Sequence, residues 1–156
     1  MLFQIRFILP LIAILALGAC ASAPLSPLSR PSPDAQGEVI VFRESAFVAG
    51  AVSLTVGSGA DAFASIGNSE KVRAMFPTGE RDIYVQARSA KPTRLRVVVN
   101  KNMPVCLRTS SSPSAYAKVI VPIVFMATGY HFYLDEVPCP PAEELAKYKD
   151  VPVAYR

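Results

Sequence analysis

The sequence of 156 residues contains one histidine, His131, and three cysteines, no two of which form a C-x-x-C pair. A metal site needs several such ligands and a dithiol redox centre needs a close pair, so we expect no metal, no cofactor and no redox function. No stretch reaches the roughly 18 uninterrupted apolar residues of a membrane-spanning helix, which excludes a polytopic membrane protein. The length predicts one domain with a core of its own.

Apolar residues are concentrated at the start of the chain. They make up 51% of the whole sequence, but 15 of the first 19 residues belong to this class. The apolar run 7–19 follows the single charge of Arg6 and has the length of the core of a secretory signal peptide. The run ends in Leu17-Gly18-Ala19-Cys20, which resembles the bacterial lipobox, where the signal is cleaved before a cysteine that becomes lipidated.

The lipobox resemblance implies that residues 1–19 are removed and that Cys20 anchors the protein in a membrane through its acyl chains. Two or more chains make such an attachment stable. The alternative is a general signal peptide followed by an incidental cysteine. In Gram-negative sorting, an Asp after the lipidated cysteine retains a lipoprotein in the inner membrane. Ala21 therefore implies an outer-membrane protein that faces the periplasm.

The two remaining cysteines, Cys106 and Cys139, form an even pair in an oxidising compartment. We expect a structural disulfide between them. It would close a loop of about 34 residues and stabilise the fold by roughly 3–4 kcal/mol in the chain-entropy model.

Residues 20–36 are expected to be a tether, and residues 37–156 the folded domain. Four prolines and four serines lie in 21–36, a composition that buries little apolar surface. From residue 37 onward, alternating apolar residues are interrupted by turn residues, which predicts an all-β, antiparallel sandwich or barrel. A short helix is expected at 141–149. The expected strands are 38–43, 51–56, 62–66, 70–76, 81–88, 94–99, 103–109, 117–126 and 130–137.

Several short motifs occur in a characteristic order: VIVFRES (39–45), VSLTV (52–56), PTGE (77–80), IYV (83–85) and YLDEV (133–137). This order resembles the bacterial domain of unknown function 2846, a family of small secreted or lipidated envelope proteins, and is similar to PEGA-type surface modules. The resemblance covers residues 37–145 and implies a PEGA- or prealbumin-like antiparallel β-sandwich. Because the family has no established reaction, it implies no catalytic site. The Asp-Gly hairpin tip expected from the family is replaced here by residues 57–61 (GSGAD).

Three motifs that resemble functional sites are better explained structurally. Residues 57–62 fit the dinucleotide pattern G-x-G-x-x-A, but the residues that follow make a poor helix, so a hairpin turn is favoured. His131 lacks partners for a triad or a zinc site and is interpreted as a structural histidine flanked by aromatic residues. Glu80 and Asp82 are spaced like paired carboxylates, but they follow a Pro-Thr-Gly turn and are expected to be solvated.

Positive charge is clustered although the total is small. The net charge of +4 falls to +3 once Arg6 is removed, which is too little to predict nucleic-acid binding. Six basic residues fall within an acid-free stretch, and they would form one basic face if strands 81–88, 94–99 and 103–109 were neighbours. Such a face would contact an anionic envelope polymer or lipid head groups, or it would simply be a solvated sheet surface. The six are Arg88, Lys91, Arg94, Arg96, Lys101 and Arg108.

The apolar run 119–127 is either a buried strand or a surface that docks a partner, and Pro122 argues against a central strand.

Together these features predict a lipid-anchored, non-catalytic envelope module with a structural or binding role. Its expected partners are the membrane, through Cys20, and another envelope protein or an anionic polymer. The alternative is an accessory subunit of a secretion, transport or surface assembly, reached through residues 119–130. An enzyme is not expected, because the sequence offers no cluster of polar residues that would supply a mechanism.

Overall fold

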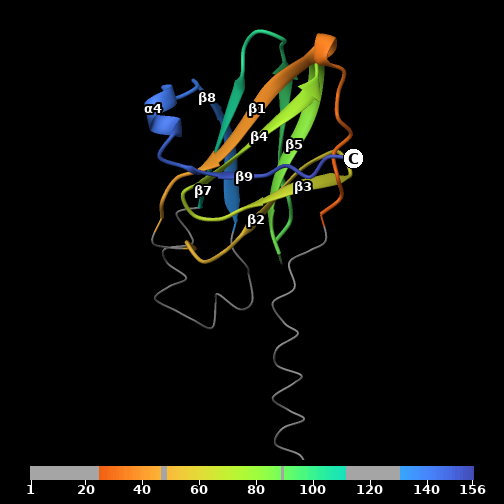
Figure 1. Cartoon of the computed structure of the whole chain (residues 1–156). Coiled ribbons are helices and arrows are strands. Elements are labelled where there is room, and N and C mark those ends of the chain that lie inside the picture. Colours follow the sequence, from red (N-terminus) through yellow and green to blue (C-terminus); the bar gives the residue numbers. More distant parts are fainter. Residues whose placement is uncertain (1–24, 47–48, 89, 112–130) are drawn as a thin grey trace, which may run out of the picture.

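The computed structural model describes residues 25–46, 49–88, 90–111 and 131–156 (Figure 1). In these residues, two β-sheets face each other and one short α-helix lies outside them, which confirms the predicted all-β sandwich. In chain order the elements are η3 (Pro33–Ala35), β1 (Gln36–Arg43), β2 (Leu54–Ser58), β3 (Asp61–Ile66), β4 (Glu70–Pro77), β5 (Gly79–Ala87), β6 (Thr93–Val99), β7 (Val105–Ser111), β8 (Phe132–Val137), α4 (Ala142–Leu145) and β9 (Lys149–Val151).

The two sheets differ in how their strands pair. The four-stranded sheet has the order β3-β2-β5-β6 and is antiparallel throughout. The five-stranded sheet has the order β8-β7-β1-β4-β9, and its β1–β7 and β4–β9 pairs are parallel. Alternation of apolar residues predicts the strands but not which distant strands become neighbours, so these two parallel pairs are additions to the antiparallel prediction.

The core lies between the sheets and is formed by inward side chains at every second strand position. On β1, Val39 and Val41 are almost completely buried in this core. Phe63 of β3 and Phe76 of β4 meet edge to face across the sandwich, with ring centroids 5.6 Å apart. On β6 the same alternation buries Val97 and Val99 and leaves Arg96 and Val98 exposed. The period-two pattern therefore sets which residues reach solvent.

A second apolar cluster covers the outer face of the five-stranded sheet. Leu145 of α4 packs on Ile40, Phe42 and Cys106, and the ring of Tyr148 contacts that of Phe42 at 5.2 Å. The helix ends at Leu145, so the predicted helix at 141–149 is too long.

The residues after α4 form β9, a strand that the sequence analysis missed. The buried ammonium group of Lys71 holds the segment that leads into this strand. It donates to the carbonyl oxygen of Tyr148 at 2.7 Å and lies 3.1 Å from the Asp150 carboxylate. Pairing of β9 with the edge of β4 then satisfies backbone groups that would otherwise remain open.

Residues 25–35, which the sequence analysis assigned to the tether, lie along the domain. The amide of Ser26 donates to the carbonyl oxygen of Ala62 at 2.8 Å. Leu28 is 7% exposed, and its backbone bonds to Ala154 and Arg156 near the end of the chain. The folded domain therefore begins before residue 37, because the side chain of Leu28 is part of the hydrophobic core.

Several predictions fall on residues outside the described ranges. They are the signal peptide 1–19, the lipidated Cys20, the first part of the tether, the strand 117–126 and the apolar run 119–127. Within the described ranges, no helix is long and apolar enough to cross a membrane.

Candidate functional site

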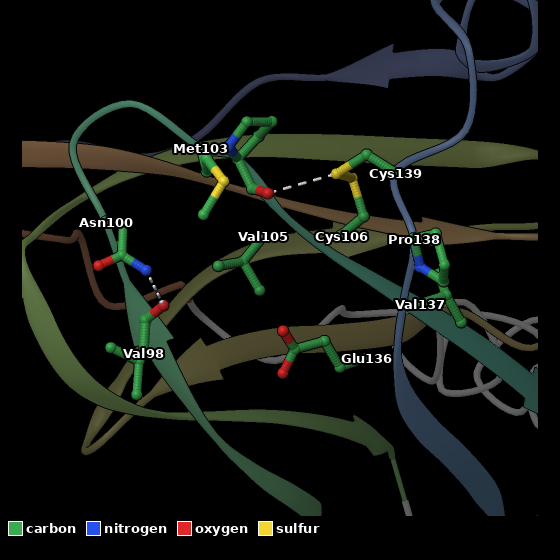
Figure 2. Close-up of a pocket in the computed structure, with 10 residues that line it drawn as sticks. Val98, Asn100, Met103, Val105, Cys106, Glu136, Val137, Pro138 and Cys139 are labelled. Atoms are coloured by element: carbon green, nitrogen blue, oxygen red, sulfur yellow. Dashed lines mark hydrogen bonds between the residues drawn. A yellow bond between two sulfur atoms is a disulfide. The ribbon is translucent and has the colours of Figure 1, made fainter.

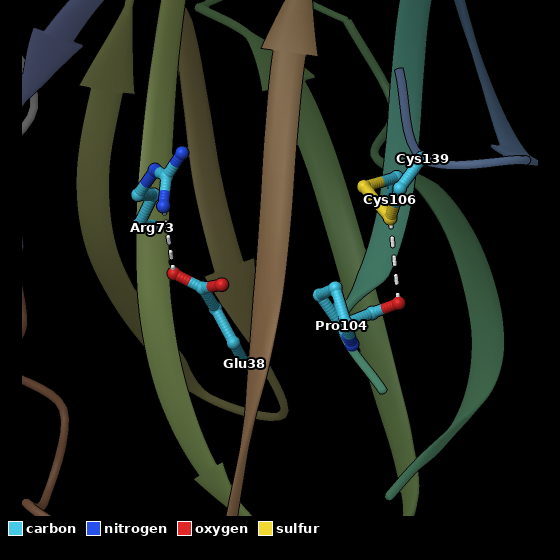
Figure 3. The surroundings of a disulfide bond; sticks show 5 residues. All are labelled: Glu38, Arg73, Pro104, Cys106 and Cys139. Carbon is cyan, nitrogen blue, oxygen red and sulfur yellow. Dashed lines mark hydrogen bonds and ion pairs between the residues drawn. A yellow bond between two sulfur atoms is a disulfide. The ribbon is translucent and has the colours of Figure 1, made fainter. Parts of the chain in front are cut away.

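Cys106 and Cys139 form the predicted disulfide, with their Cα atoms 5.0 Å apart (Figure 3). Cys106 is buried in β7, whereas Cys139 follows β8 and is exposed. The Cys139 sulfur lies 3.4 Å from the carbonyl oxygen of Pro104, beside the turn that leads into β7. The bond therefore ties β7 to the segment that carries α4 onto the outer face of the sheet.

A groove of about 420 Å³ lies beside this disulfide (Figure 2). Its wall includes Val98 and Met103, whose exposed fractions of 54% and 65% are large for apolar residues. Glu136 contributes a carboxylate to a groove that polar and apolar atoms line about equally. The residues that line the groove include no nucleophile paired with a base.

The basic residues of β6 are neutralised on the outer face of the four-stranded sheet. Arg94 lies 2.9 Å from Asp82, and Arg96 lies 3.8 Å from Glu80, both across the β5–β6 pair. The guanidinium of Arg94 also stacks on the Tyr84 ring at 4.9 Å. These pairs are solvent-exposed and contribute little stability each. They also give Glu80 and Asp82 a role as ion-pair partners on the sheet surface.

The other four basic residues do not join Arg94 and Arg96 on one face. The predicted neighbour relation is wrong for the third strand, because β6 and β7 belong to different sheets. Arg108 of β7 lies 3.6 Å from Glu44, and Lys101 lies in the turn that crosses between the sheets. Arg88 and Lys91 are exposed on the β5–β6 connection.

The glycine motif forms a hairpin, as the sequence analysis favoured. Gly57 and Ser58 end β2, Gly59 adopts a φ of +59° in the turn, and β3 begins at Asp61. A strand follows the turn where the dinucleotide fingerprint requires a helix. His131 directly precedes β8 and is exposed, so it is not a residue of the core.

A smaller polar pocket, of about 140 Å³, lies where β1 and β7 end. It contains Arg43, which is 2% exposed, and Thr109, which is completely buried. Burial lowers the pKa of the Arg43 guanidinium from its usual value. The Thr109 hydroxyl has no hydrogen-bond partner within the described residues. An unpaired buried hydroxyl costs about 1–3 kcal/mol.

This pocket was not predicted, although the sequence contains a signal for it. Arg43 lies two residues after Val41, on the same inward face of the strand as Val39 and Val41. The period-two pattern predicts an apolar residue at this position. A charge at a core position of a strand indicates either a structural clamp or a site.

No group of three or more His, Cys, Asp or Glu side chains suited to hold a metal ion occurs in the described part of the chain. Comparison of the chain with protein-family models, with curated proteins and with solved structures finds no match in any of the three.

Proposed function

We propose that the protein is a lipid-anchored envelope module that faces the periplasm and has a structural or binding role. The observation that carries the proposal is the sequence Leu17-Gly18-Ala19-Cys20, at the end of a signal-like apolar run. The Cys106–Cys139 disulfide fits an oxidising compartment. The proposal assigns no reaction to the protein, since the sequence offers no set of groups for one.

The way the N-terminal segment packs supports a module held close to its membrane. Leu28 is buried, and backbone hydrogen bonds join residues 26–28 to β3 and to the end of the chain. An anchor at Cys20 would therefore leave only a short free segment before the folded domain.

The anchor is tested by expressing the full chain in a Gram-negative host and measuring the mass of its N-terminal peptide. We expect cleavage before Cys20 and a mass increase that corresponds to a diacylglyceryl group plus an N-acyl chain. The variant Cys20→Ser should lose the lipid and leave the membrane fraction, whereas the exposed control Ser29→Ala should keep both. An unmodified Cys20 in mature protein, or a cleavage site elsewhere, would contradict the proposal.

Mild crosslinking followed by purification distinguishes an independent binding module from an accessory subunit of an envelope assembly. Recovery of one defined envelope protein would assign the module to an assembly, as an accessory subunit. Recovery of lipid or polymer alone would support an independent binding module.

A further inference from the structure

The inward face of the five-stranded sheet becomes polar where β1 and β7 end. Val39 and Val41 of β1 face the core, and Arg43 occupies the next inward position. Thr109 lies directly across from Arg43 in the parallel β1–β7 register. Both residues are less than one-tenth exposed, so a cation and a hydroxyl close this end of the core together.

The partners that Arg43 has among the described residues are neutral. Its guanidinium donates to the carbonyl oxygens of Ala49, at 2.5 Å, and Val52, and it lies 5.0 Å from the centre of the Phe132 ring. No carboxylate within the described ranges forms an ion pair with it. Carbonyl oxygens and an aromatic face offset part of the desolvation of this charge, but none of these described partners supplies a counter-ion.

The pocket beside Arg43 provides both space and donors. Hydroxyl groups of Ser45, Thr109, Ser110 and Ser111 belong to residues that line it. Its volume of about 140 Å³ far exceeds the roughly 15 Å³ that one water requires. The acid at the pocket, Glu44, is exposed and lies 3.6 Å from Arg108. The negative charge of Glu44 is therefore partly offset by Arg108 and not by Arg43.

We propose that this pocket binds a small oxyanion, a phosphate, sulfate or carboxylate group, between the Arg43 guanidinium and the Thr109 hydroxyl. The anion would provide a negative charge beside the Arg43 guanidinium and would accept a hydrogen bond from the Thr109 hydroxyl. The serine hydroxyls that line the pocket would donate further hydrogen bonds to it. The site does not depend on the membrane anchor. A purely structural Arg43, which only clamps the loop carbonyls, would show no such binding.

The test measures thermal unfolding of the full-length protein in detergent, in Tris-chloride buffer of constant ionic strength. Inorganic phosphate, sulfate and acetate are titrated separately against chloride. We expect a saturable rise in Tm with at least one of them, and the anion with the largest effect identifies the chemistry of the natural group. Amide NMR signals of Thr109 and Ser110 should shift with the same midpoint.

The variant Thr109→Val separates the proposal from a general salt effect. Without oxyanion it should have a Tm at or above that of the wild type, because it removes a buried unpaired hydroxyl. Its apparent anion affinity should fall about tenfold, the effect of losing one charge-assisted hydrogen bond. The control Thr55→Val, in the other sheet, should titrate like the wild type.

Ser111→Ala is a second variant in case Thr109→Val does not fold, and it should also weaken the response. Equal titrations of the wild type and both pocket variants would overturn the proposal. So would the absence of a saturable response to all three anions.

Discussion

At the residue scale, Gly57 and Tyr84 show how one missing side chain shapes the four-stranded sheet. The two residues are directly opposite in the β2–β5 register, and the Tyr84 ring lies over Gly57. The Tyr84 hydroxyl donates to the carbonyl oxygen of Asp61 at 3.3 Å, so the ring also holds the start of β3. Burial raises the pKa of Tyr84 from its usual value, and Asp61 adds to this while Arg94 opposes it. An aromatic ring over a strand glycine is a recurrent way of covering exposed backbone.

We predict that Gly57→Ala lowers the free energy of unfolding by about 1–3 kcal/mol, the typical cost of overpacking. A Cβ atom at this position would overlap both the Tyr84 ring and the Asp61 carbonyl oxygen. Gly67→Ala is the matched control, because its nearest neighbour is the flexible Glu70 carboxylate at 3.2 Å. Urea unfolding measures both variants, and equal stabilities would show that Tyr84 is not packed on Gly57.

At the scale of elements, residues 26–28 and 154–156 close one edge of the sandwich. β9 covers only Glu70–Val72 of β4, so the edge of β4 is open beyond Val72. There the Tyr155 hydroxyl accepts a hydrogen bond from the amide of Met75 at 2.8 Å. Leu28 pairs with Tyr155, and Ala154 bonds to Phe63 of β3. These two segments thus occupy an edge that would otherwise be available for pairing with another chain.

Tyr155→Phe is predicted to cost about 1 kcal/mol of unfolding free energy, the usual net value of one hydrogen bond. The ring and its contact with Arg30 should remain, and the amide of Met75 should exchange faster with solvent. Tyr133→Phe is the control because Tyr133 is 50% exposed, and its effect should stay within about 0.5 kcal/mol. Denaturant unfolding and hydrogen exchange measure both effects. Unchanged exchange at Met75 would contradict this role of Tyr155.

Sequence patterns predicted the local elements of this fold better than their distant partners. The strands of the described ranges with clear alternation, and the disulfide, were identified correctly. β9 was missed because its polar sequence Lys149-Asp150-Val151 pairs through its backbone and carries no apolar period. The prediction of one basic face assumed that successive strands are neighbours in one sheet. It was wrong because the connection at Asn100–Met103 crosses from one sheet to the other. Arg43 was overlooked although its inward position was visible in the sequence.

At the scale of the whole molecule, the docking of residues 25–35 determines how far the domain can move from a lipid anchor. From Cys20 to Leu25 an extended chain reaches about 17 Å, whereas a free tether from Cys20 to Gln36 would reach about 55 Å. If Cys20 is lipidated as proposed, the domain is held close to the head groups. Leu28 would then control this distance, because it is a buried apolar residue of the docked segment.

We therefore predict that Leu28→Asp moves the domain away from the membrane. A buried carboxylate without a partner is unfavourable, so the segment should detach and lengthen the tether. Neutron reflectometry of the lipidated protein on a supported bilayer measures the solvent gap between head groups and protein. The gap should stay below about 17 Å in the wild type and widen well beyond it in the variant.

The control Leu25→Asp introduces the same charge at a residue that is 41% exposed, and it should leave the gap unchanged. Circular dichroism establishes that both variants retain the sandwich. A folded Leu28→Asp protein with the wild-type gap would show that residues other than Leu28 hold the segment in place.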